Sequence, residues 1–213
     1  MKKFLSLSLV LIIVLTSCSK QNIQDVVIDN QSAKNTPENI TANTTVSNVT
    51  APTFTSYLIR KGNHYCDQSS LKSVSTSEMK FVARFDTSAI YTSINPVNQF
   101  DINKLYGFSE GFDNQYNSAR IGWRWSDGAL RLFGYVYKTG TRYSQEITSI
   151  PFNTDITCSI KLSGNTYLIT ANGVSVSLPR GLNSTKASGF QQYPYFGGDE
   201  VAQKNITIKI GNL

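Results

Sequence analysis

The sequence predicts an all-β domain, a sandwich or barrel of antiparallel strands, over residues 53–213. From Phe54 onward apolar and polar residues alternate with a period of two, and aromatic and β-branched residues are abundant. Turn signals recur roughly every 8 to 12 residues, which is typical of β-sandwiches and barrels. The segment KFVARF (80–85) illustrates the alternation, because Phe81, Ala83 and Phe85 fall on one face. No long segment has the periodicity of a helix.

The first 18 residues have the features of a lipoprotein signal peptide. A basic start, MKK, precedes an apolar run over residues 4–15 that is too short to span a bilayer as a helix. The run ends in Leu-Thr-Ser-Cys (15–18), which resembles the bacterial lipobox. The resemblance implies cleavage before Cys18 and lipidation of its sulfur, and acyl chains contribute about 0.8 kcal/mol per buried CH₂. We therefore expect a lipid anchor in the bacterial cell envelope, at either side of the outer membrane. The alternative is an ordinary signal peptide cut nearby.

Residues 19–52 form the second segment, which is rich in Asn, Thr, Ser and Gln and has no aromatic ring. It cannot bury enough apolar surface to offset its ordering entropy, so we expect a flexible linker. Without Lys2 and Lys3 the net charge falls from +6 to +4. This mild excess is compatible with an acidic partner, and no basic run indicates nucleic acid.

Three turn signals predict the register of the central strands, since Asp-Gly and Asn-Gly favour two-residue hairpins. With a turn at 127–128, four pairs share one apolar face: Trp125 with Leu130, Trp123 with Leu132, Ile121 with Gly134, and Ala119 with Val136. Turns at 164–165 and 172–173 pair Ile169 with Ile160 and with Val176. Both turns assign the same face of strand 166–171 to the core, whereas a one-residue slip would invert it.

The opposite face of the first hairpin collects cations and rings, namely Arg120, Arg124, Arg131, Phe133, Tyr135 and Tyr137. In this register Arg124 faces Arg131, an unfavourable pair of like charges that costs about 0.2 to 1 kcal/mol. Glu146 on the next strand, stacking on the rings, or an external anion could compensate. Uronate or sulfate groups of a polysaccharide suit the last case, because arginine grips a carboxylate with two hydrogen bonds while rings stack on sugars. A solvent-exposed face of stacked arginine stems is the alternative.

The remaining chemistry-bearing residues are few. Cys66 and Cys158 could form a disulfide, worth about 4 kcal/mol in the chain-entropy model, or could be two buried free thiols. His64 is the only histidine, so no metal-ligand spacing is present. Asp199 and Glu200 follow two glycines, which predicts a plain turn, with a weak Ca²⁺ site as the alternative. Cofactor motifs are absent, so we expect no cofactor.

Four stretches resemble a family of uncharacterised Bacteroidota lipoproteins: IRKGNHYCDQ (59–68), INKLYGFSEG (102–111), ARIGWRWSDGALRLFGYVY (119–137) and YPYFGGDE (193–200). The resemblance covers about residues 54–213. It implies a concanavalin A-like jelly roll, a β-sandwich of two antiparallel sheets. In this broad fold one sheet bends, and its concave face often holds sugars.

These observations lead us to expect a noncatalytic glycan-binding module, with an anionic polysaccharide as the partner. One alternative is a polysaccharide lyase or glycoside hydrolase of the same fold. Its glucanases carry Glu-x-Asp-x-x-Glu and its lyases Gln-x-His, and neither pattern occurs here. A lyase would use His64 and Tyr135 for proton transfer and Arg124 to neutralise the uronate, although His64 also suits a hydrogen-bonded edge residue. The other alternative is an adhesive or structural surface lipoprotein with a protein partner.

Overall fold

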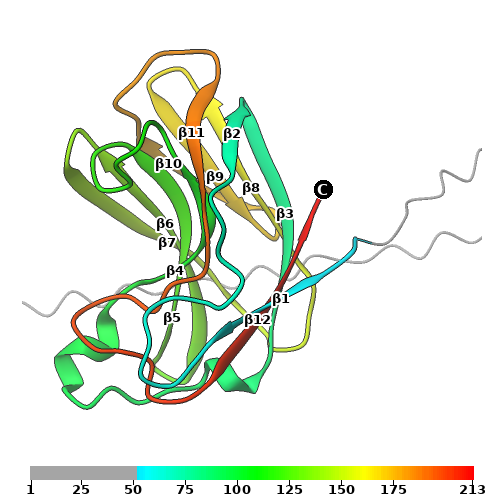
Figure 1. Cartoon of the computed structure of the whole chain (residues 1–213), viewed down its shortest axis with the longest axis vertical. Coiled ribbons are helices and arrows are strands. Elements are labelled where there is room, and N and C mark those ends of the chain that lie inside the picture. The colour runs from blue at the N-terminus through cyan, green and yellow to red at the C-terminus, as the bar shows by residue number, and fades with distance from the viewer. Residues whose placement is uncertain (1–51) are drawn as a thin grey trace, which may run out of the picture. The chain divides into compact units, whose positions relative to one another are not determined.

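The computed structural model describes residues 52–213, and the statements below concern this part of the chain. The expected signal peptide, the lipidation site Cys18 and the linker as far as residue 51 lie outside the described residues. The described part is a sandwich of two six-stranded antiparallel sheets (Figure 1). This architecture confirms the predicted all-β jelly-roll sandwich.

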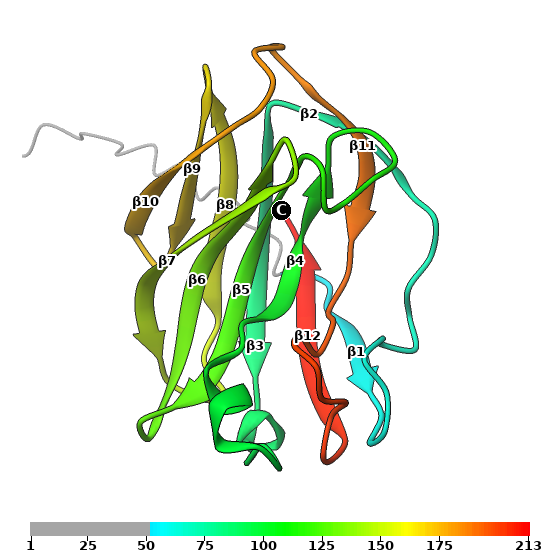
Figure 2. The same ribbon diagram turned by 90° about the vertical axis from the view of Figure 1, so that its left-hand side faces the viewer.

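The two sheets are built from strands far apart in sequence. Sheet 1 has the spatial order β1 (Thr55–Ile59), β12 (Ile206–Asn212), β3 (Glu78–Phe85), β8 (Ile156–Ser163), β9 (Thr166–Ala171) and β10 (Val174–Pro179). Sheet 2 has the order β2 (Ser73–Thr76), β11 (Ala187–Gln192), β4 (Asn103–Ser109), β5 (Ser118–Ser126), β6 (Ala129–Lys138) and β7 (Thr141–Ile150). Figure 2 shows β4, β5, β6 and β7 side by side in front of sheet 1.

All three predicted hairpins form in the predicted register. Trp123 pairs with Leu132 between β5 and β6, and Ile169 pairs with Ile160 of β8 and with Val176 of β10. The turn between β5 and β6 places Asp127 and Gly128 at φ values of 54° and 71°. Positive φ at both central residues is the geometry that the Asp-Gly signal favours.

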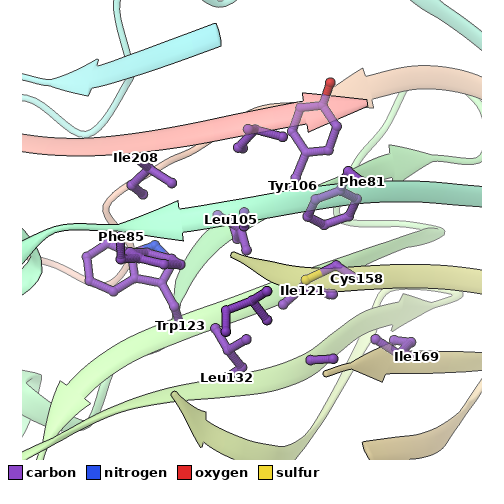
Figure 3. Packing of buried hydrophobic residues seen from close by; sticks show 14 of the residues in the cluster. Phe81, Phe85, Leu105, Tyr106, Ile121, Trp123, Leu132, Cys158, Ile169 and Ile208 are labelled. Carbon is purple, nitrogen blue, oxygen red and sulfur yellow. The ribbon is translucent and has the colours of Figure 1, made fainter. Parts of the chain in front are cut away.

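The core lies between the two sheets, as the alternation requires. Its central side chains come from both layers and are nearly all inaccessible to solvent (Figure 3): Phe81, Phe85, Leu105, Tyr106, Ile121, Trp123, Leu132, Cys158, Ile169 and Ile208. At position 134, opposite Ile121, a glycine lies close against the other sheet. A Cβ there would lie 2.8 Å from the Leu178 side chain and 2.9 Å from that of Val176, so these side chains of β10 would have to shift.

A buried ion pair that the sequence did not reveal closes one end of this core. Arg180, just after β10, donates from Nε and Nη2 to the Glu110 carboxylate at 2.7 and 2.6 Å, and both side chains are 1% exposed. The Tyr167 hydroxyl also donates to Glu110, and the Ser184 carbonyl accepts from Arg180 Nη1 at 2.7 Å. The network ties β4, β9 and the segment after β10 together, and each charge in it has partners.

The two cysteines of residues 52–213 are free thiols, so the disulfide alternative is not realised. Cys66 follows β1, Cys158 lies in β8, and both are buried. Burial raises the pKa of Cys158 to about 12, which keeps the thiol protonated at neutral pH. The helical content of residues 52–213 is two short 3₁₀ helices, η1 (Thr87–Ala89) and η2 (Pro96–Phe100). Neither has the length and hydropathy of a membrane-spanning helix.

Candidate ligand-binding site

A pocket of about 580 Å³ lies on the outer face of sheet 2. Strand alternation creates it: Ala119 and Ile121 point into the core, so Arg120 between them points outward. Two segments beside the sheet, at 65–69 and 193–199, and the β4–β5 loop also contribute walls. The lining residues that matter chemically are Tyr65, Lys104, Asn114, Gln115, Arg120, Tyr135, Tyr137, Arg142, Gln192, Tyr195 and Asp199.

Cross-strand pairing sets the floor of the pocket. Gln192 of β11 pairs with Gly107 of β4, Gly107 pairs with Arg120 of β5, and Arg120 pairs with Tyr135 of β6. The position on β4 across from Arg120 must be glycine, because a Cβ at Gly107 would lie 2.1 Å from the carbonyl oxygen of Ala119. The backbones of β4 and β5 therefore approach closely at the floor of the pocket.

Arg120 is a buried cation that has no ion-pair partner within residues 52–213. It is 6% exposed, its guanidinium carbon lies 5.4 Å from the centre of the Tyr135 ring, and Nη2 donates weakly to the Asn114 carbonyl at 3.4 Å. Its Nε has no acceptor in the described chain. Burial lowers the pKa of Arg120, since desolvation disfavours the charged form. A buried charge normally has an opposite charge beside it, and among residues 52–213 Arg120 has none.

Lys104 is the second cation of the pocket. Its Nζ lies 4.9 Å from the ring centre of Tyr135 and 5.7 Å from that of Tyr195. Burial, and then repulsion by Arg120 and Arg142, lowers the pKa of Lys104 from 10.5 to about 8, against a smaller opposing effect of Asp101. Without a bound anion, burial and mutual repulsion therefore disfavour the charged form of Lys104.

The rim adds a third cation, a carboxylate and rings. Arg142 on β7 is exposed and pairs across the sheet with Tyr137 of β6. Within residues 52–213, Lys104, Arg120 and Arg142 form no ion pair. Asp199 is exposed and is the single acidic residue of the lining. The positive charge therefore exceeds the negative charge at this site.

The aromatic part of the rim is centred on Tyr195. The Tyr65 ring is 68% exposed and meets Tyr195 edge-on, with 5.1 Å between ring centres. Tyr135 and Tyr137 contact each other edge-on at 5.9 Å. Burial, and then the neighbouring Tyr137, raises the pKa of Tyr135 to about 12, so its hydroxyl is protonated and able to donate at neutral pH.

The structure divides the arginine-aromatic face that the sequence predicted into two parts. Arg120, Tyr135 and Tyr137 line the pocket, whereas Arg124, Arg131 and Phe133 lie outside it. Arg124 donates to the Phe100 carbonyl at 2.9 Å and to the Ser126 hydroxyl at 3.1 Å. Its guanidinium also lies 4.7 Å from the centre of the Phe133 ring, and this ring is itself buried.

The positive charge of Arg131 is paired within the chain with Glu146, the carboxylate that the sequence suggested. Its Nη1 donates to Glu146 at 2.9 Å, and Asp127 lies 3.6 Å from Nη2. Arg124 and Arg131 do face each other, as predicted. The repulsion between Arg124 and Arg131 is offset by Glu146, by Asp127 and by stacking of Arg124 on Phe133. The part of the face outside the pocket therefore needs no external anion.

The three residues that a lyase would need are not brought together. Of the three, Tyr135 alone lines the pocket, and Arg124 is bonded as described above. His64 is half-buried, its Nδ1 lies 2.7 Å from the Phe196 carbonyl, and its ring stacks on Tyr195 at 5.2 Å. His64 is thus hydrogen-bonded to the backbone, as expected for the structural interpretation of this residue.

Glu200, one of the two residues considered for calcium, binds backbone instead. Its carboxylate accepts from the N–H groups of Ile94 and Asn95 at 2.8 and 2.7 Å and from the side chain of Asn98 at 2.9 Å. These bonds lower the pKa of Glu200, led by the one from Asn95. Over residues 52–213 no group of three or more His, Cys, Asp or Glu side chains is placed to hold a metal ion.

Sequence reasoning missed Lys104, Tyr65 and Tyr195 as pocket residues. The β4–β5 register contains an irregularity between Lys104 and Tyr106, and a long loop joins the two strands. Simple alternation therefore could not place Lys104 beside Arg120. The stretch YPYFGGDE, noted for its family resemblance, was the available signal for Tyr195.

Comparison with known proteins finds solved structures that are distantly similar in fold. No protein-family model matches the chain, and no curated protein matches it. Among solved structures, a marine PL7 alginate lyase from Zobellia galactanivorans is 14% identical with a TM-score of 0.43; the match covers 74% of this chain and 62% of the lyase. A functionally unknown protein from Saccharomyces cerevisiae is 11% identical (TM-score 0.47, covering 74% and 84%). The carbohydrate-binding module CBM66 from Bacillus subtilis is 9% identical (TM-score 0.34, covering 69% and 82%). Because these TM-scores are below 0.5, no ligand or activity is carried over to this chain.

Proposed function

We propose that this protein is a lipid-anchored protein of the bacterial cell envelope whose domain binds an acidic polysaccharide without cleaving it. The observation that carries the proposal is Arg120, a cation 6% exposed that lines an open pocket and has no carboxylate partner among the described residues. An uncompensated buried charge is costly to the folded chain. A bound carboxylate or sulfate removes that cost and gains charge-assisted hydrogen bonds.

The other pocket residues suit a sugar rather than a small inorganic anion. Tyr65 and Tyr195 offer ring faces and edges at the rim, and Gln192, Gln115 and Asn114 offer amide groups to hydroxyls. Lys104 and Arg142 add positive charge on either side of Arg120. A polymer with an acidic group on each sugar would use all of these groups, whereas a neutral glycan would leave the three cations unpaired.

The noncatalytic part of the proposal is supported by the state and position of Tyr135 and His64, the two residues that a lyase would use for proton transfer. The Tyr135 hydroxyl holds its proton at neutral pH because its pKa is raised to about 12, so it is suited to donate to a sugar oxygen. His64 faces the Phe196 carbonyl. A lyase must remove a proton beside the uronate carboxylate, and the one imidazole of residues 52–213 lies against a backbone carbonyl instead of lining the pocket.

The test is retention of the soluble chain, residues 19–213, on immobilised alginate, polygalacturonate and dextran sulfate, with neutral dextran as the blank. We expect retention on at least one uronate polymer, loss of retention in Arg120→Met, and no loss in Arg124→Met. Absence of retention on all three acidic polymers would refute polysaccharide binding. Release of unsaturated uronate products, followed by their ultraviolet absorbance, would refute the noncatalytic part and leave the binding intact.

A further inference from the structure

Two phenylalanine rings contact each other on the face that holds the pocket of Arg120 and Lys104, which we call the basic pocket. Phe112, in the loop between β4 and β5, is 92% exposed, and its ring centre lies 5.1 Å from that of Phe190 on β11. We refer to Phe112 and Phe190 as the aromatic pair. A side chain as exposed as Phe112 contributes little to folding, and its ring, in contact with a second ring, is free to stack on a ligand.

The aromatic pair shares a face with the pocket. Gln192, which lines the pocket, points outward on β11, and Phe190 two residues earlier points to the same side, roughly 7 Å away. Phe190 and Gln192 are thus consecutive outward positions of one strand. A ligand lying on the outer face of sheet 2 would contact both.

The β4–β5 loop holds Phe112 in place and also joins the two regions. The Gly111 N–H donates to the Ser188 carbonyl at 2.8 Å, which fixes the loop against β11 (Figure 2). Asn114, two residues after Phe112, lines the pocket, and its carbonyl accepts from Ser118 and from Arg120. The same loop therefore carries one ring of the aromatic pair and one wall of the pocket.

Size favours a sugar over a protein as the occupant. Two phenylalanine side chains offer at most about 500 Å² of surface even if fully covered. A stable protein interface needs about 800 Å² on each partner, with a larger buried core. A sugar ring stacked on one or two aromatic rings needs no more than this pair supplies. The groups between the pair and Arg120, Gln192 and Asn114, are amides suited to hydroxyls.

We propose that the aromatic pair is a second subsite of the glycan-binding site, so that the ligand is an oligosaccharide with a charged sugar in the basic pocket and a sugar ring further along the same chain, beyond the adjacent one, stacked on Phe112. This inference rests on the proposed function. It makes chain length a determinant of affinity, because a ligand too short to span both regions cannot contact the rings.

The experiment compares uronate disaccharides and hexasaccharides, prepared from alginate and from polygalacturonate, by titration calorimetry on the chain 19–213. We expect the hexasaccharide to bind more tightly. Phe112→Ala should weaken hexasaccharide binding about tenfold, equivalent to about 1.4 kcal/mol, and leave disaccharide binding unchanged. Ile94→Ala is the matched control, because Ile94 is 79% exposed but lies in the segment before β4, whereas Phe112 follows β4.

The outcomes separate this inference from the proposed function. Unchanged hexasaccharide affinity in Phe112→Ala, or equal affinity of the wild-type chain for both lengths, would overturn the second subsite while the basic pocket stands. Failure of the wild-type chain to bind either length would overturn the proposed function itself. Thermal unfolding of both variants should match that of the wild type, since each loses a side chain that is mostly in solvent.

Discussion

Replacing Arg120 by methionine should abolish ligand binding and make the free domain more stable. The unpaired Nε costs about 1–3 kcal/mol in the folded state, and repulsion from Lys104 adds to that cost. The substitution also removes the contact of the guanidinium with the Tyr135 ring, which stabilises the folded state by about 0.5–2 kcal/mol. The net expectation is a gain of about 1 kcal/mol, which for a domain of this size raises the unfolding midpoint by about 2–4 °C.

Arg124→Met is the control on the same strand and the same face. Arg124 is half-buried and donates two hydrogen bonds, to Phe100 and Ser126, while stacking on Phe133. Hydrogen bonds from a charged group contribute about 1.5–3 kcal/mol each when buried, and partial exposure reduces this. We expect a loss of about 1–2 kcal/mol and a midpoint lowered by about 2–8 °C.

Thermal unfolding of both variants, followed by circular dichroism without ligand, gives the two midpoints under one set of conditions. The expected signs are opposite. A midpoint for Arg120→Met that falls as far as that for Arg124→Met would show that Arg120 is compensated in the free protein, and the reasoning that links its burial to ligand binding would fail.

Three further results are expected. Affinity for an alginate or polygalacturonate hexasaccharide should be constant from about pH 5, where carboxylates are ionised, to about pH 7, and should fall as pH rises through about 8, since Lys104 with its lowered pKa loses its charge there; Lys104→Arg should remove this fall, and a fall that persists would assign it to another group. Glu110→Gln should lower the unfolding midpoint by roughly 10 °C, because it leaves Arg180 buried without its anion at a cost of about 3–5 kcal/mol; an unchanged midpoint would contradict this. Reductant should leave the midpoint unchanged, and a thiol reagent should label Cys66 and Cys158 only on unfolding, whereas a midpoint lowered by reductant would indicate a disulfide.

The sequence predicted the fold best where strands are joined by two-residue turns. Asp127-Gly128 and Asn172-Gly173 fix the pairing of their strands, because a tight turn leaves no freedom of register. The buried and outward faces of β5 followed from that register and are observed. β4 and β11 are joined to their neighbours by long connections, so nothing local in the sequence fixes their positions.

The sequence predicted the part of the candidate site that lies on β5 and β6, but not the part that other segments contribute. Arg120 and Tyr135 were placed opposite each other correctly, since they belong to the Asp-Gly hairpin. Arg124, in contrast, is engaged within the chain by Phe100, whose carbonyl accepts from it, and Phe100 comes from η2 before β4. Neither that contact nor the approach of Tyr195 to Lys104 leaves a periodic trace in the sequence.

The claim on which the function depends is that the pocket binds the negative charge of its ligand. The direct measurement is titration calorimetry with the uronate hexasaccharide, alginate or polygalacturonate, that is retained best, and with the same hexasaccharide after its carboxylates are converted to methyl esters. We predict that the charged form binds at least tenfold more tightly and that Arg120→Met removes most of this difference. Equal affinity of the two forms for the wild-type chain would contradict the claim.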